Sequence, residues 1–238
     1  MIIAMLLAHL VGDYVLQWDK LAAWKSRAVK GAVAHGLIVL TVTVLFALPF
    51  EVAFVPYALF IGLTHIAVDA FQPWLGRRVP LNGPGLFGLG RLLLDQAVHF
   101  SLITLALIWG GYVTLPTLGA DLLAALQHDH RLTLLLGYVF LAMPAWILVE
   151  FVVYGLVNGS APDFAQAIQC KYVGTLERWL IITFVMLGQF PLVPLVALPR
   201  LFFEAPQVLG TQRTTLYVSE LLASVGLAIA IGLALRWL

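Results

Sequence analysis

The sequence predicts an all-helical protein embedded in a membrane, a polytopic bundle of about seven transmembrane helices. The first observation is composition: of 238 residues, 62% are apolar and only 11% are charged, which lies outside the usual range of soluble domains. The second is that the apolar residues form long runs, and about 20 such residues cross a bilayer. The third is a set of polar residues inside those runs. The expected spans are residues 2–17, 30–50, 53–75, 91–116, 132–156, 173–198 and 216–238.

The first span is short, and it carries His9 and Asp13 within its apolar run. It lacks the basic segment and the small-residue cleavage site of a signal peptide, so we interpret it as a retained helix. Lysines and arginines concentrate after the first and third spans, and such loops stay in the cytoplasm. Seven spans then place the amino terminus outside and the carboxyl terminus, near Arg236, inside. The basic residues of these two loops are Lys20, Lys25, Arg27, Lys30, Arg77, Arg78 and Arg91.

The net charge argues against nucleic-acid binding, and the cysteine count excludes one kind of covalent link. A formal net charge of +1 provides no basic surface for nucleic acid. A single cysteine, Cys170, excludes a disulfide within the chain. The expected partner is instead membrane lipid.

Seven side chains able to bind a metal lie inside apolar runs of the first hundred residues. An aspartate at the bilayer centre costs roughly 2.5 to 3.5 kcal/mol to insert, so these residues require a strong compensating interaction. Three of the runs carry a His and an Asp four residues apart, which places both on one helix face. The expected topology brings all seven to similar depth in the cytoplasmic half. They are His9, Asp13, His35, His65, Asp69, Asp95 and His99.

These residues provide nitrogen and oxygen donors without sulfur, which suits zinc, manganese or iron. Seven donors exceed the needs of one tetrahedral ion. Either two ions share the site, or one ion uses three or four residues while the others orient ligands and move protons. The predicted ligands are His9, Asp13, His65, Asp69, Asp95 and His99, with His35 as a further ligand or a proton shuttle.

A short internal repeat supports a shared site. The phrase Ala8–Asp13 is similar to Thr64–Asp69, and the following helices carry the similar phrases Ala32–His35 and Gln96–His99. The repeat predicts two parallel helical hairpins related by a pseudo-two-fold axis along the membrane normal. We therefore expect a four-helix bundle with the metal site over residues 1–116. A three-helix supporting region would follow over residues 117–238, within a single membrane domain.

The chain also resembles a known family. Leu7–Gln17, the lysine-bearing loop before His35, His65–Asp69 and Leu94–His99 look like a bacterial family of polytopic membrane proteins classified as a domain of unknown function. The resemblance covers about the first 110 residues and implies a location in the bacterial inner membrane. The His-x-x-x-Asp pattern is more loosely similar to inner-membrane metal-dependent hydrolases, which implies hydrolysis.

The favoured function is therefore metal-assisted hydrolysis of a lipid ester or phosphoester near the cytoplasmic face. Glu150 and Glu177, in the cytoplasmic parts of later spans, are candidate catalytic bases facing the same cavity. Three alternatives stay open. The cluster could form a proton or cation transport pathway, it could ligate a pigment or haem in a larger complex, or it could consist of interhelical hydrogen bonds alone.

Overall fold

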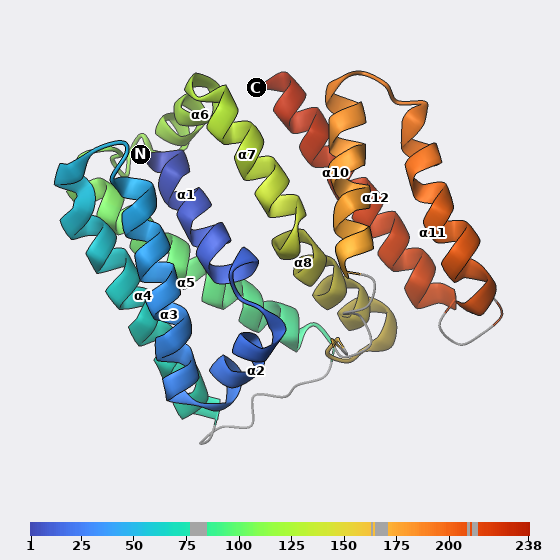
Figure 1. Ribbon diagram of the computed structural model, residues 1–238, viewed down its shortest axis with the longest axis horizontal. Helices are drawn as coiled ribbons and strands as arrows, with labels where there is room; N and C mark the ends of the chain where they lie inside the picture. Colours follow the sequence, from blue (N-terminus) through green and yellow to red (C-terminus); the bar gives the residue numbers. More distant parts are fainter. Residues whose placement is uncertain (77–84, 163, 165–170, 209, 211–213) are drawn as a thin grey trace. The chain divides into compact units, whose positions relative to one another are not determined.

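The computed structural model describes the whole chain except residues 77–84, 163, 165–170, 209 and 211–213 (Figure 1). The described residues form helices and turns and no strand, so the predicted all-helical class is confirmed. They fall into two compact units. The first comprises described residues of Met1–Leu81 and Leu93–Val139, and the second those of Asn82–Leu92 and Phe140–Leu238.

Among the described residues, four helices are long and apolar enough to cross a membrane, and two bent helix pairs could each form one further span. Several helices therefore suit a membrane, but the predicted count of seven is not confirmed. The four helices are α3 (Val29–Ala47), α4 (Val55–Gly76), α5 (Phe87–Trp109) and α12 (Thr214–Trp237).

The first bent pair replaces the predicted span over residues 2–17. Helix α1 (Ile2–Leu10) continues into a π-helical turn, η1 (Val11–Val15), and the chain then turns by 89° into α2 (Asp19–Arg27). Exposed side chains dominate α2, whereas seven of the nine residues of α1 are buried. The polar sequence after Gln17 explains why the apolar run ends there.

The second bent pair corresponds to the predicted span over residues 132–156. Helix α7 (His130–Leu141) meets α8 (Met143–Val153), followed by η3 (Tyr154–Asn158), at an angle of 43°. Pro144 stands at the start of α8, and proline cannot donate the backbone hydrogen bond that a continuous helix requires. The proline therefore accounts for a break that hydropathy alone does not reveal.

The predicted span over residues 173–198 is also divided. Helix α10 (Lys171–Met186) ends before Gly188, whose φ of 73° is left-handed, and α11 (Leu192–Val208) begins after Pro191. A glycine just past a helix end, followed by proline, is a common stop signal. Within the second unit, α10 lies beside both α11 and α12 (Figure 1).

Small residues bring the helices of the first unit together. A Cβ added at Gly62 would lie 2.7 Å from the Leu40 Cα atom, so α4 and α3 are in close backbone contact, as Figure 1 also shows. The ends of these helices nearest α6 (Leu118–His128) enclose an apolar cluster. It consists of Ala4, Met5, Ala47, Phe54, Ala58, Ile61, Ile103, Ala106, Leu107 and Val113.

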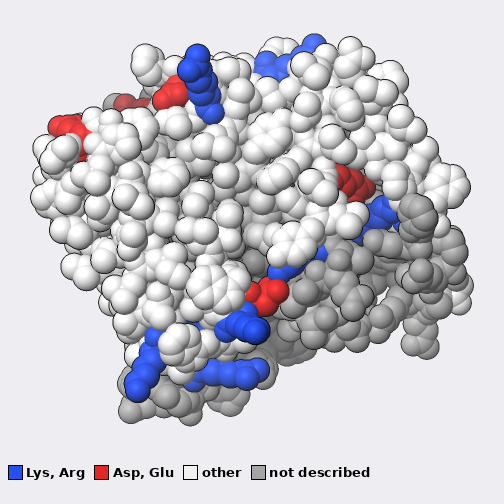
Figure 2. All heavy atoms as spheres, in the orientation of Figure 1, with Lys and Arg blue, Asp and Glu red and all other residues white. Residues whose placement is uncertain are grey.

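Charged side chains are sparse on the face of the molecule in Figure 2. Large apolar residues such as Leu45, Leu63 and Leu222 are more than half exposed, which is costly in water and favourable in lipid. In the first unit, lysines and arginines gather where α2 and the start of α3 lie (Figures 1 and 2). This pattern agrees with a polar, interfacial end of the first unit.

Candidate metal centre

Two close helix contacts and a π-helical turn position the histidines and aspartates of the first unit. A Cβ at Gly12 would lie 3.1 Å from Val39 Cα, so η1 approaches α3 directly beside Asp13. A Cβ at Gly36 would lie 3.1 Å from Ile66 Cα, so α3 packs closely on α4 at the residues that directly follow His35 and His65. The π-helical turn of η1 widens the helix at Asp13, and such turns are frequent at functional sites.

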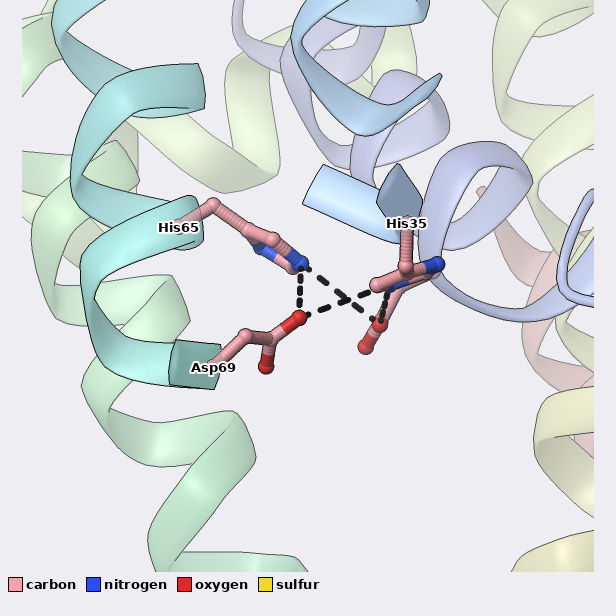
Figure 3. A group of neighbouring side chains, drawn as sticks. His35, His65 and Asp69 are labelled. Carbon is pink, nitrogen blue, oxygen red and sulfur yellow. Dashed lines mark hydrogen bonds and ion pairs between the residues drawn. The ribbon is translucent and has the colours of Figure 1, made fainter. Parts of the chain in front are cut away.

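The first group of candidate ligands contains Asp13, His35, His65 and Asp69. All four are buried, and one donor atom of each lies within 4.8 Å of the others. His35 Nε2 lies 3.0 Å from Asp13 Oδ1 and 3.5 Å from Asp69 Oδ2. His65 Nε2 lies 3.7 Å and 3.1 Å from the same two oxygens. Figure 3 shows the imidazoles of His35 and His65 and the carboxylate of Asp69 pointing toward one another.

These four distances fit a tetrahedral metal ion. Zinc binds histidine nitrogen and carboxylate oxygen at about 2.1 Å, so two ligand atoms of a tetrahedral site lie about 3.4 Å apart. The four separations between the histidine nitrogens and the aspartate oxygens, from 3.0 to 3.7 Å, bracket that value. Each histidine nitrogen therefore lies from each aspartate oxygen at a spacing that suits ligands of one ion, and all four donor atoms lie within 4.8 Å of one another.

The second group contains Asp69, Asp95 and His99. His99 Nε2 lies 3.7 Å from Asp69 Oδ1 and 3.5 Å from Asp95 Oδ1. Its ring stacks on that of His65 with centroids 4.1 Å apart. Asp69 therefore belongs to both groups, with Oδ2 facing the first and Oδ1 facing the second. A carboxylate in this position can bridge two ions or connect one ion to a neighbouring pair.

Several donor atoms of the site are buried without a hydrogen bond. Within the described part of the chain, His65 Nε2, His99 Nε2 and both carboxylate oxygens of Asp69 lack a hydrogen-bond partner in acceptable geometry, although ion pairs surround them. A buried polar atom normally finds a partner, because leaving it unpaired costs about 1 to 3 kcal/mol. These convergent atoms contact one another and Lys25 as ion pairs, and a bound cation would coordinate them directly.

Lys25 is the residue of this site that the sequence interpretation missed. Its Nζ atom lies 3.3 Å from Asp13 Oδ1 and 2.9 Å from Asp69 Oδ2. The sequence pattern assigned Lys25 only to the basic loop that sets orientation. One signal could have indicated its role: three aspartates in apolar helices need a nearby positive charge.

Two glutamines complete the polar network. The Gln96 side chain lies 3.0 Å from His9 Nε2 and donates to Asp13 Oδ2 and Asp95 Oδ2 at 3.2 and 3.1 Å. The Gln72 amide donates to Asp95. His9 is buried and lies 4.0 Å from Asp13 Oδ2, but it belongs to neither group of candidate ligands. Its role as a ligand stays a prediction, whereas His35 lies within the first group.

The predicted bases Glu150 and Glu177 lie in the second unit, on α8 and α10. Both are buried, with exposed fractions of 5%. Arg200 Nη1 lies 3.5 Å from Glu177 Oε2. The predicted cavity that these glutamates share with the histidines and aspartates stays a prediction.

Residues 1–124 match the family described as "Protein of unknown function (DUF3307)". The match covers just over half of the chain, so the chain belongs to this family, and the resemblance to a domain of unknown function is confirmed. It includes every residue of both candidate ligand groups, Lys25, Gln72 and Gln96. No curated protein and no solved structure matches the chain.

Proposed function

We propose that this member of the family binds a divalent metal ion within the membrane and uses it to hydrolyse a lipid ester or phosphoester. The observation that carries the metal proposal is the first ligand group, in which Asp13, His35, His65 and Asp69 present donor atoms at tetrahedral spacing. The burial of these side chains supports it, because a cation offsets the cost of burying carboxylates.

The charges of the site favour one ion. Asp13, Asp69 and Asp95 carry three negative charges, and the ammonium group of Lys25 offsets one of them. The three carboxylates exceed the charge of Lys25, and a single divalent cation offsets the remainder. A second divalent ion beside Asp95 and His99 would need an anion from elsewhere, such as an anionic substrate. Zinc, manganese and iron suit these donors, because none of them is sulfur.

Hydrolysis is the reaction class that this site suits best. A bound divalent ion would activate water and polarise a carbonyl or phosphoryl oxygen. Asp95 and His99 lie directly beside the first ligand group and can accept a proton there. Glu150 and Glu177 keep the role of bases that the sequence proposes for them. The apolar faces of the surrounding helices favour a substrate with a hydrophobic tail, consistent with membrane lipid as the partner.

The transport alternative has less support. The ligand groups lie along the same helices as the apolar cluster of the first unit, which occupies the opposite ends of α1, α3, α4 and α5. Partial exposure is found instead at Lys25 and Asp95, whose side chains are 16% and 19% exposed. This favours a site that is accessible from one side. We propose that it opens toward the cytoplasmic face of a bacterial inner membrane, with the amino terminus outside.

Metal analysis of the purified protein tests the proposal. The protein would be isolated in mild detergent without chelator, and bound metals would be measured by mass spectrometry. We expect about one zinc, manganese or iron ion per chain, lost in His35→Ala and His65→Ala. His128→Ala, which changes an exposed histidine of α6, should keep it. Equal metal content in all four proteins would contradict the proposed metal site. A protein that binds metal but hydrolyses neither a lipid ester nor a phosphoester would contradict the proposed hydrolase activity.

A further inference from the structure

Lys25 enters the candidate metal site from a helix that lies across the bundle. Helix α2 turns by 89° from α1 and η1, and its cations Lys20 and Arg27 are exposed. Lys25 differs from them, because its side chain is only 16% exposed and reaches the buried aspartates. Gly31 holds this arrangement: a Cβ there would lie 2.7 Å from the Lys25 backbone nitrogen, so α3 packs directly on this turn of α2.

The ammonium group and the candidate metal ion share the same two oxygen atoms. Lys25 Nζ contacts Asp13 Oδ1 and Asp69 Oδ2, the oxygens that also face His35 and His65 in the first ligand group. Two buried carboxylates this close together need a cation in order to stay ionised inside the protein. Lys25 supplies one in the protein without metal.

We propose that Lys25 is a built-in counter-cation that competes with the metal ion for Asp13 and Asp69 and so keeps metal binding reversible. The inference rests on the proposed metal site and adds the regulation of its affinity. A lysine suits this role because its charge is compact and its stem is flexible. The stem allows the ammonium group to withdraw toward the exposed edge of the site, as long cationic side chains do at interfaces.

A different role for Lys25 predicts the opposite result. If the ammonium group only orients the two carboxylates toward the ion, its loss should weaken metal binding about 10- to 100-fold, as loss of supporting hydrogen bonds does elsewhere. Competition instead predicts stronger binding, because the ion then meets two carboxylates without a rival cation. The sign of the change in affinity therefore separates the two roles.

The experiment measures zinc affinity by competition with a chromogenic chelator, using the full chain in detergent. Lys25→Met should bind Zn²⁺ roughly tenfold more tightly than wild type or better, and release it more slowly. Lys20→Met, on the exposed side of the same helix, should match wild type. Co²⁺ absorption should report the same tetrahedral site in all three proteins.

Lys25→Arg gives an independent arm if Lys25→Met does not fold. A guanidinium group clamps carboxylates more firmly than an ammonium group does, so competition predicts weaker zinc binding than in wild type. Unchanged or weaker binding by Lys25→Met, or unchanged or tighter binding by Lys25→Arg, would overturn the inference while leaving the metal site in place. Absence of binding in wild type and every variant would instead remove the proposed function, and the inference with it.

Discussion

The two units each bury charged residues in an apolar surrounding, but Arg178 of the second unit and the histidine and aspartate cluster of the first unit differ in the partners of their polar atoms. In the second unit, Arg178 donates to the carbonyl oxygens of Leu141 and Ala142 at 2.7 and 3.0 Å and to the hydroxyl groups of Ser224 and Thr175 at 3.1 and 3.2 Å. Two of its partners, the carbonyls of Leu141 and Ala142, lie at the break between α7 and α8. The guanidinium group of α10 thus connects the break between α7 and α8 to α12.

The cluster of the first unit is held by ion pairs rather than by backbone carbonyl groups. The buried nitrogen and oxygen atoms of His65, His99 and Asp69 contact one another and Lys25, and they converge on common points. A paired cluster stabilises a fold, whereas a converging, incompletely paired cluster is prepared for a ligand. The difference suggests that loss of Arg178 harms stability, and that loss of the first cluster's residues harms metal binding.

The largest expected effect is on stability in the second unit. Arg178→Met should lower the free energy of unfolding by about 3 kcal/mol or more, because two buried carbonyl groups lose their donors. Thermal unfolding in detergent would measure this loss, with Arg131→Met, at an exposed position, as the control with no change. If Arg178→Met unfolds at the wild-type temperature, the structural interpretation of this cluster is wrong.

The next effect is on metal affinity without a matching loss of stability. Asp69→Asn should weaken metal binding by about 100-fold or more, because it removes a ligand shared by both groups. In the presence of chelator, the same variant should unfold within about 1 kcal/mol of wild type, because Lys25 keeps Asp13 as its partner and no buried charge is left uncompensated. Isothermal titration and thermal unfolding provide the two values. A large loss of stability in chelator would make Asp69 a structural residue like Arg178.

A substitution that disturbs helix packing should moderately lower both the stability of the protein and its affinity for zinc. Gly36→Ala introduces a Cβ atom 3.1 Å from Ile66 Cα and still closer to the Ile66 side chain, so α3 and α4 must separate. Overpacking of this kind costs about 1 to 3 kcal/mol, and it would also shift His35 relative to His65. Gly226→Ala, where an added Cβ meets nothing within 4 Å, is the matched control. Equal stability and zinc affinity in the two variants would show that the close contact does not set the site.

The smallest expected effect concerns His9. Because its Nε2 atom lies 3.0 Å from Gln96 and outside both ligand groups, His9→Ala should weaken zinc binding by less than about tenfold. His65→Ala, measured in the same titration, should weaken it far more. Comparable losses in the two variants would restore His9 to the ligand set that the sequence predicts.

The helical class and the meeting of the polar residues follow from the sequence because both depend on simple periodicity. Long apolar runs require helices in a membrane, and a spacing of four places His65 with Asp69, and Asp95 with His99, on one face. Six of the seven predicted residues, all except His9, lie in the two ligand groups.

The remaining features depend on local backbone chemistry and tertiary contacts. Lys25 resembled an ordinary cytoplasmic charge until the 89° turn placed it against Asp13 and Asp69. The breaks near Ala142 and Gly188 do have sequence signals, in Pro144 and in the glycine and proline around residues 188–191, but mean hydropathy averages over them. A span count based on hydropathy therefore treats broken helices as continuous.

X-ray absorption at the zinc edge tests the central claim most directly, because it reports the ligands of the bound ion. The protein would be loaded with one equivalent of Zn²⁺ and compared with His65→Ala. The account predicts four nitrogen or oxygen ligands at about 2.0 to 2.1 Å, with imidazole scattering that decreases in the variant. A sulfur ligand, or scattering that is identical in the two proteins, would contradict it.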